Sequence, residues 1–180
     1  MKLVYTALVS FAILSTAAIG MPGQGKKPLS VHLQPLAPYL GKTYKGEFAG
    51  STPEKPVYDI AHWERALNGQ AIRITHSLNN GQYGGESIVM WDPKKKSLAS
   101  WYFTTAGFFT QATMTIEKNK LIAHEKVTGN QNGITEVRST TEFLPGGEMK
   151  RKAEFLQKEK WVPGHSIHYK EAPDAKVIFK

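Results

Sequence analysis

The chain has 180 residues, with 23 Lys and Arg against 15 Asp and Glu, giving a formal charge of +8; this length bounds it to one domain with at most a short extra segment. The absence of cysteine excludes disulfides, thiolate metal sites and cysteine nucleophiles. A hydrophobic content of 41% with 16 glycines excludes a wholly disordered chain.

The first twenty residues have the pattern of a signal peptide. Lys2 supplies a positive charge, Leu3 to Ile19 is uncharged, and Ala18-Ile19-Gly20 fits a small-x-small cleavage site. A transmembrane anchor is the alternative, but the apolar run is at the lower limit of a span and its flank is rich in proline and glycine. We therefore expect residues 1–20 to be removed on export, to a bacterial periplasm, and residues 21–33 to form a flexible leader.

The remainder, residues 34–180, is predicted to form one all-β domain after a short helical turn. Leu33, Leu36 and Leu40 recur at helical spacing before Gly41. From Thr43 onward apolar residues alternate with polar ones, and turn signals recur roughly every 8–12 residues. We expect about ten strands, near residues 43–49, 57–67, 70–78, 83–91, 97–105, 108–117, 120–128, 133–143, 149–157 and 160–169. A closing strand over residues 175–179 is left open.

The order of these strands predicts a closed barrel. Sequential hairpins give up-and-down connectivity, and no helix-period segment is long enough for a parallel crossover. Closure removes the two exposed edges that an open sheet would leave. We therefore expect a single antiparallel up-and-down β-barrel of about ten strands with a short N-terminal helix, wide enough inside for a small ligand.

Two short motifs resemble those of lipocalin-like barrels. The run Gly41-Lys-Thr-Tyr44-Lys-Gly46-Glu-Phe48 resembles their glycine–aromatic–glycine opening, with Tyr44 in place of Trp. Trp91-Asp92-Pro93 and Trp101-Tyr102-Phe103-Thr104 are similar to the middle hairpin of secreted, uncharacterised bacterial members. The resemblance implies a calycin-type barrel that binds apolar or amphipathic small molecules, and it implies little about which ligand.

Two tight turns predict which side chains face inward. A two-residue turn at Asn68-Gly69 makes paired positions sum to 137, and a turn at Lys118-Asn119 pairs Ile116 with Leu121. The apolar faces that result carry three chargeable residues, Arg65, His76 and Glu125. Buried charges are costly unless they are paired or used, so these residues are candidates for ligand contact. The inward apolar residues are predicted to be Trp63, Ile72, Ile74, Met114, Ile116, Leu121 and Val127.

The predicted ligand-binding set follows from these faces and from the aromatic hairpin. Arg65 would hold a carboxylate or phosphate, while His76 or Glu125 would make one hydrogen bond. Apolar neighbours would cover the rest of the ligand. The full predicted set is Arg65, His76, Glu125, Trp63, Ile74, Trp101 and Phe103. The competing interpretation is a structural Arg–Glu pair that fills the interior.

Three functions stay open at this point: a secreted carrier of a small apolar or amphipathic ligand, an anionic one included; an enzyme using His76 and Glu125 as acid and base; and a filled structural barrel. A haem-binding barrel is a weaker alternative, in which one inward histidine of the last strand, His165 or His168, would be the axial ligand. We found no nucleophile, nucleotide or metal motif, and we predict no cofactor, no metal and no catalytic residue.

The basic charge lies mainly in turns, including Lys94–Lys96 and the pair Lys158 and Lys160, where lysines discourage aggregation. Nucleic acid is not an expected partner of an exported protein. Weak contact with an anionic membrane surface is the alternative use of this charge. The sequence leaves the oligomeric state open.

Overall fold

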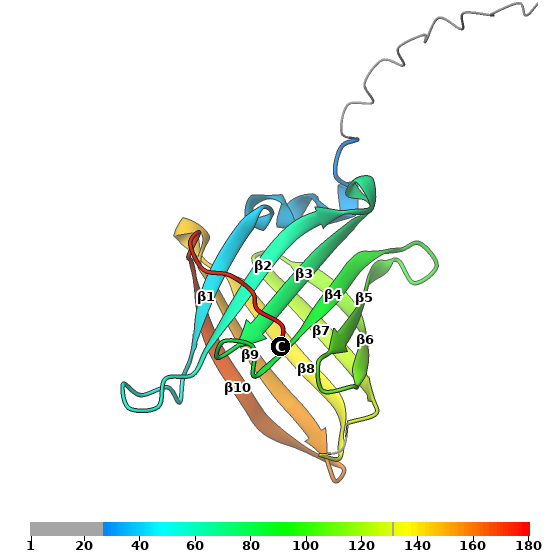
Figure 1. Cartoon of the computed structure of the whole chain (residues 1–180). Coiled ribbons are helices and arrows are strands. Elements are labelled where there is room, and N and C mark those ends of the chain that lie inside the picture. The colour runs from blue at the N-terminus through cyan, green and yellow to red at the C-terminus, as the bar shows by residue number, and fades with distance from the viewer. Residues whose placement is uncertain (1–26, 131) are drawn as a thin grey trace, which may run out of the picture.

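The computed structural model describes residues 27–130 and 132–180, and its strands close into one antiparallel barrel (Figure 1). The strands are β1 (Lys42–Phe48), β2 (Tyr58–Ala66), β3 (Ala71–Leu78), β4 (Tyr83–Asp92), β5 (Ser97–Thr104), β6 (Phe109–Glu117), β7 (Lys120–Thr128), β8 (Ile134–Phe143), β9 (Met149–Gln157) and β10 (Lys160–Glu171). Each strand pairs with its neighbours in the chain, and β1 pairs with β10 to close the barrel. The predicted up-and-down barrel is confirmed, while the predicted signal peptide lies outside the described residues.

The two predicted registers are confirmed. Across β2 and β3 the pairs run from Asp59 with Leu78 to Ala66 with Ala71, so every pair sums to 137. Across β6 and β7, Ile116 pairs with Leu121. Asn68 and Gly69, with Leu67 before them, have positive φ and form the short 3-10 turn η2 (Leu67–Gly69). A second such turn, η3 (Pro145–Gly147), joins β8 to β9.

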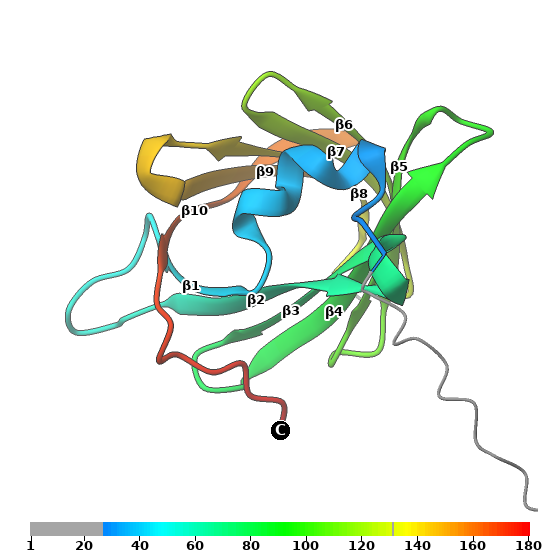
Figure 2. The ribbon, with the colours of Figure 1, turned by 90° about the horizontal axis from the view of Figure 1, so that it is seen from above.

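A helix before β1 closes one end of the barrel (Figure 2). This helix, η1 (Val31–Tyr39), is a 3-10 helix, in which side chains three residues apart lie in one row. Leu33, Leu36 and Tyr39 form that row, and all three are buried in the core cluster that also contains Tyr44 of β1. Leu40, which α-helical spacing predicts to lie in this row, instead follows the helix as its C-cap residue. The packed row makes this half of the interior a solid core.

The folded part begins earlier than the predicted boundary at residue 34. Residues 31–33 were assigned to a flexible leader, but they form the first turn of η1. The Ser30 backbone N–H donates to the Gly69 carbonyl at 2.8 Å. The His32 ring stacks on Trp91 of β4, with ring centroids 3.6 Å apart. These contacts attach the helix to the β2–β3 and β4 ends of the barrel.

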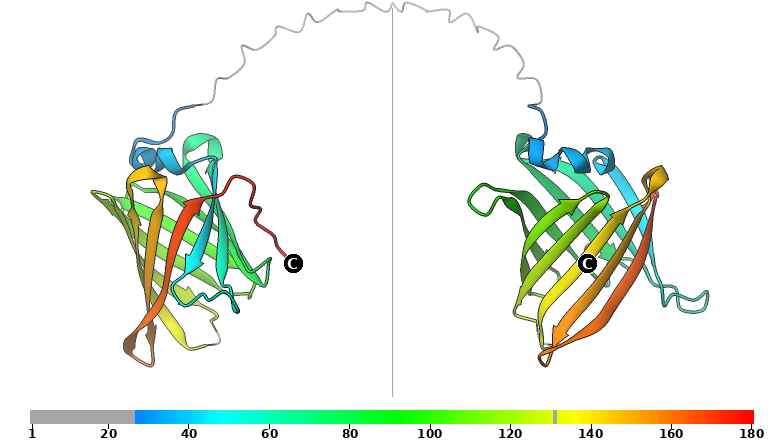
Figure 3. Two further views of the ribbon diagram at one scale, coloured as in Figure 1. Left: turned by 90° about the vertical axis from the view of Figure 1, so that its left-hand side faces the viewer. Right: turned by 180° about the vertical axis from the view of Figure 1, so that it is seen from behind.

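After β10 the chain runs along the outside of the barrel (Figure 3). Residues 175–179, for which a closing strand was an open possibility, do not form a strand. Instead, the Ile178 backbone N–H donates to the Ser77 hydroxyl of β3 at 3.0 Å, so the segment lies as a strap across the sheet. No helix within residues 27–130 and 132–180 is long and apolar enough to cross a membrane.

Candidate functional site

A cavity of about 400 Å³ occupies the half of the barrel that lies away from η1. Its lining includes Leu78, Phe108 and Asn130, which lie next to the turns at the end opposite η1, and it includes no residue of η1. The wall between the cavity and the packed half is formed by Trp63, Val89, Met114, Leu121 and Met149. The interior is therefore half packed and half open, with its opening at the end opposite the helix.

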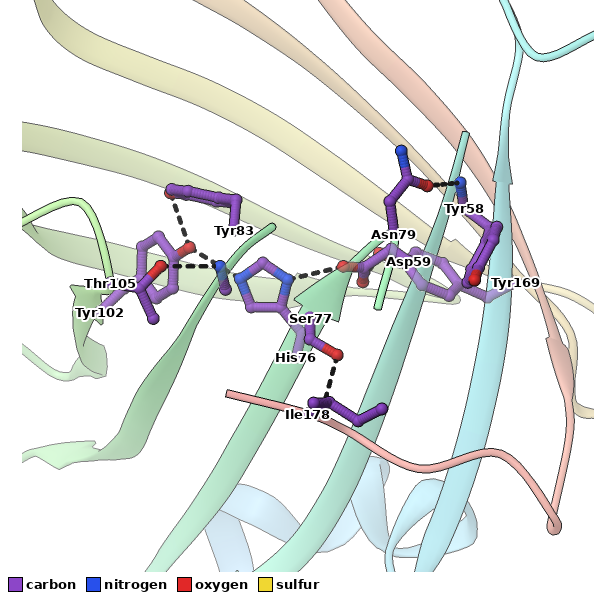
Figure 4. Close-up of polar contacts among 11 residues, drawn as sticks. Tyr58, Asp59, His76, Ser77, Asn79, Tyr83, Tyr102, Thr105, Tyr169 and Ile178 are labelled. Atoms are coloured by element: carbon purple, nitrogen blue, oxygen red, sulfur yellow. Dashed lines mark hydrogen bonds and ion pairs between the residues drawn. The ribbon is translucent and has the colours of Figure 1, made fainter. Parts of the chain in front are cut away.

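A chain of hydrogen bonds crosses one side of this cavity (Figure 4). Asp59 Oδ1 lies 2.7 Å from His76 Nδ1, and His76 Nε2 lies 2.7 Å from the Tyr102 hydroxyl. The Tyr102 hydroxyl donates to the Tyr83 hydroxyl at 2.8 Å, and Tyr169 donates to Asp59 Oδ2 at 2.9 Å. Asp59 is only 3% exposed, and both of its oxygens are occupied. The chain therefore leads from a buried carboxylate to Tyr83, a residue that lines the cavity.

Two glycines make room for the tyrosine rings of this chain. A Cβ at Gly46 of β1 would lie 2.6 Å from Cδ1 of Tyr169, and one at Gly85 of β4 would lie 2.5 Å from Cε2 of Tyr102. No side chain fits at such distances, so each ring lies directly over bare backbone. Gly46 also belongs to the glycine–aromatic–glycine motif of the sequence. Its structural role here is to let Tyr169 reach Asp59.

The tyrosines of the chain stay protonated at neutral pH. Burial is the main cause that raises the pKa of Tyr102 and of Tyr83 above the ordinary value for tyrosine. Burial likewise raises the pKa of Tyr169, and the neighbouring charge of Asp59 adds to the effect. Each hydroxyl is therefore an uncharged group that can donate one hydrogen bond.

A second polar cluster joins the neighbouring strands β6 and β7 to β9, which lies on the far side of β8. Thr110 donates to Glu125 Oε2 at 2.8 Å, and Arg151 donates to Glu125 Oε1 at 3.3 Å. All three side chains line the cavity. The alternative predicted from sequence, a structural pair of Arg65 with Glu125, does not form, and the cation paired with Glu125 is Arg151. The Arg151–Glu125 pair leaves the cavity open.

His165 of β10 lines the cavity at an irregular place in the wall. The β9–β10 ladder shifts register between Pro163 and Ser166, and His165 lies within that bulge. Burial, together with the charges of Arg151 and His76, lowers the pKa of His165 to about 4. The imidazole is therefore neutral at physiological pH. His168 lies on the other face, 2.7 Å from Glu148, so the predicted opposite orientation of the two histidines is confirmed.

The lowered pKa of His165 predicts a loss of stability in mild acid. In the unfolded chain His165 has its ordinary pKa of about 6.5, whereas in the folded barrel its pKa is about 4. Between these two values the unfolded chain binds a proton that the folded barrel does not bind. The free energy of unfolding therefore falls as the pH falls through this window. We expect His165→Gln to flatten this dependence. The measurement is urea unfolding at about pH 7 and about pH 5. His62→Gln on the outer face is the control, and an unchanged pH slope in His165→Gln would contradict the assignment.

The structure places four of the seven predicted ligand-binding residues in the cavity wall. His76, Glu125, Trp63 and Ile74 all line the cavity. Arg65 does not: its guanidinium donates to the Asn68 carbonyl at 3.0 Å, at the η1 end of the barrel. It shares the inward-facing register of Trp63, as predicted, but it is the last such residue before the turn. Its long side chain extends out of the interior and reaches water, as basic side chains commonly do.

Trp101 and Phe103 lie on the outside of the barrel, so their predicted place in the lumen is wrong. Trp101 is 37% exposed and Phe103 is 53% exposed. On β5 the inward positions are Ser100 and Tyr102. The aromatic run from Trp101 to Phe103 places rings on both faces of the strand, so its hydrophobicity alone does not identify the inner face.

Asp59, Tyr83 and Arg151 are site residues that were not predicted from the sequence. Strict alternation along β2 from Trp63 and Ala61 would have included Asp59, because it lies on the same face two residues earlier. No comparable pattern identifies Tyr83 or Arg151. Arg151 depends on Glu125, two strands away in the chain, and Tyr83 depends on Tyr102, whose inward orientation was not predicted.

Among solved structures, the barrel is similar to the crystal structure of Rv2717c from M. tuberculosis. The TM-score is 0.59 with 12% sequence identity, and the match covers 80% of this chain and 99% of that chain. At this identity the likeness shows the fold alone. No family model matches the chain, and no curated protein matches it.

Proposed function

We propose that this protein is an exported, calycin-type binding protein that holds a small, uncharged amphipathic molecule in its barrel. The observation that carries the proposal is the half-open interior. One end is packed by η1, while a cavity of about 400 Å³ lies at the other end and is lined mainly by apolar side chains. Small-molecule sites have this size and composition, with a few placed polar groups.

The polar groups in the cavity favour an uncharged ligand. Of the described residues that line it, Arg151 is the one Lys or Arg, and it is already paired with Glu125. Arg65, which we had expected to attract an anion, lies at the other end. Asp59 and Glu125 would repel an anion. What the wall offers is hydroxyls and the neutral imidazole of His165, which are donors and acceptors for neutral groups.

The same contacts argue against acid–base catalysis by His76 and Glu125. Both ring nitrogens of His76 and both carboxylate oxygens of Glu125 are occupied by protein partners. A catalytic acid or base must reach the proton that it transfers, and its pKa should lie near the working pH. The pKa of His165 lies well below that range, and those of the tyrosines are raised away from it. A binding role fits these groups better than a catalytic one.

Native mass spectrometry of the protein purified from its own host tests the proposal. We expect a co-purified molecule that leaves on extraction with organic solvent and rebinds when it is added back. A protein that carries no such molecule, and that takes up no apolar probe after extraction, would overturn the proposal. A haem absorption band that is lost in His165→Ala would overturn it in favour of the haem-binding alternative.

A further inference from the structure

The cavity mouth is lined by two groups of aromatic rings. In the first group, the ring centroids of Phe48 and Phe155 lie 5.8 Å and 5.7 Å from that of His165. In the second, the Tyr83 ring lies 6.5 Å from Phe108, with planes only 23° apart, and 6.0 Å from His76. All six rings line the same cavity.

The two groups come from different parts of the wall, and Phe155 and Tyr83 lie on opposite strands. The first group belongs to β9, β10 and β1, and the second to β3, β4 and the loop before β6. Around the closed ring of strands, β9 and β4 are five strands apart, which is the largest separation that ten strands allow (Figure 2). A guest in the cavity therefore lies between two aromatic surfaces.

Tyr83 also carries the polar end of the hydrogen-bond chain. Its oxygen accepts the single Tyr102 proton, which requires the His76 Nε2–H to donate to the Tyr102 oxygen while the Nδ1–H donates to Asp59. In this arrangement the O–H of Tyr83 can be donated into the cavity. Behind it, Tyr102 and His76 lead to the Asp59 carboxylate, and hydrogen bonds in such a chain polarise one another. The second aromatic wall therefore presents a fixed, uncharged donor beside a ring face.

We infer that the ligand is a planar aromatic molecule with an oxygen acceptor, such as a phenol or an aryl ketone; this rests on the proposed binding in the barrel and specifies its ligand class. The rings on the two walls would stack on the faces or edges of the guest, and the Tyr83 hydroxyl would donate to its oxygen. Aromatic contacts add affinity beyond the apolar area that they bury. A flexible aliphatic chain would gain neither the added affinity of aromatic contacts nor a fixed position for its oxygen.

Calorimetric titration with 2-naphthol and decan-1-ol, which have the same number of carbon atoms, tests this inference on the extracted full-length protein. We expect 2-naphthol to bind more tightly. Phe108→Leu and Phe155→Leu should each weaken 2-naphthol about two- to tenfold and leave decan-1-ol nearly unchanged. Tyr83→Phe, which keeps the ring, should weaken 2-naphthol about tenfold and leave 2-methylnaphthalene unchanged. Phe103→Leu on the outer face is the control.

The outcomes separate this inference from the function on which it rests. If decan-1-ol binds as tightly as 2-naphthol and the leucine variants do not discriminate, the barrel binds small molecules but has no aromatic selectivity, and the inference fails alone. If Tyr83→Phe leaves 2-naphthol affinity unchanged, the assigned donor is wrong. If the protein binds none of the probes and carries no co-purified molecule, both proposals fail.

Discussion

We expect Asp59→Asn to lower the free energy of unfolding by about 3 kcal/mol, because a buried carboxylate with two hydrogen-bond donors loses its charge and one acceptor. Asp59 accepts from His76 and Tyr169 and is almost completely buried. The amide has one acceptor oxygen, so its NH2 group must face one of these two donors. For a chain of this size the loss corresponds to a fall in Tm of roughly 6–12 °C.

The barrel contains a matched control for this variant. Glu136 lies 2.6 Å from His124 in the same kind of carboxylate–imidazole contact, but this pair lies on the exposed outer face. We expect Glu136→Gln to change the free energy of unfolding by less than about 1 kcal/mol, since exposed pairs contribute little. Equal effects of the two substitutions would show that the interior chain does not stabilise the fold. Urea unfolding monitored by tryptophan fluorescence measures both.

The residues of a turn determined how far the register could be predicted from sequence. Asn68-Gly69 marks the centre of the β2–β3 turn, which has four residues between its last paired positions, and Lys118-Asn119 forms a two-residue turn between β6 and β7; both predicted pairings are confirmed. The turn between Asp92 and Ser97 also has four residues between the paired positions, but it contains no Asn-Gly to mark its centre, and the run that follows is aromatic on both faces. The sequence around this run therefore does not indicate whether Trp101 or Tyr102 faces inward. For this reason the prediction placed Trp101 and Phe103 in the lumen, although both face outward.

The polar contacts inside the barrel show a different limit. His76 and Glu125 could be predicted to face inward because alternation is a property of single strands. Their partners could not be predicted, because the height of one strand relative to a distant one depends on the tilt and stagger of the closed barrel. Tyr102 reaches His76 across β4, and Arg151 reaches Glu125 across β8. Period-two patterns carry no information about either distance.

Filling the cavity is expected to have the largest effect on binding. Ala112 of β6 lines the cavity beside Glu125. Its replacement by tryptophan would place an indole in space that is open in the folded barrel, so the fold should survive with a modest change in Tm. A guest would then have to displace the indole or distort the wall, and we expect affinity for 2-naphthol to fall by about a hundredfold or more.

Thr113→Trp is the matched control, because Thr113 is the next residue on the same strand and its side chain is exposed on the outer face. The two variants add the same ring to the same strand, so they have similar costs in β-propensity and differ in the side of the barrel that receives the indole. We expect Thr113→Trp to bind 2-naphthol as the unmodified protein does. If both variants bind normally, the guest lies outside the lumen, and the groove over β7 to β10 beside Arg138 and Lys152 becomes the alternative site. If both lose binding, the indole disturbs β6 itself. Only a loss confined to Ala112→Trp locates the ligand inside the barrel, where the two aromatic walls and the Asp59 chain can act on it.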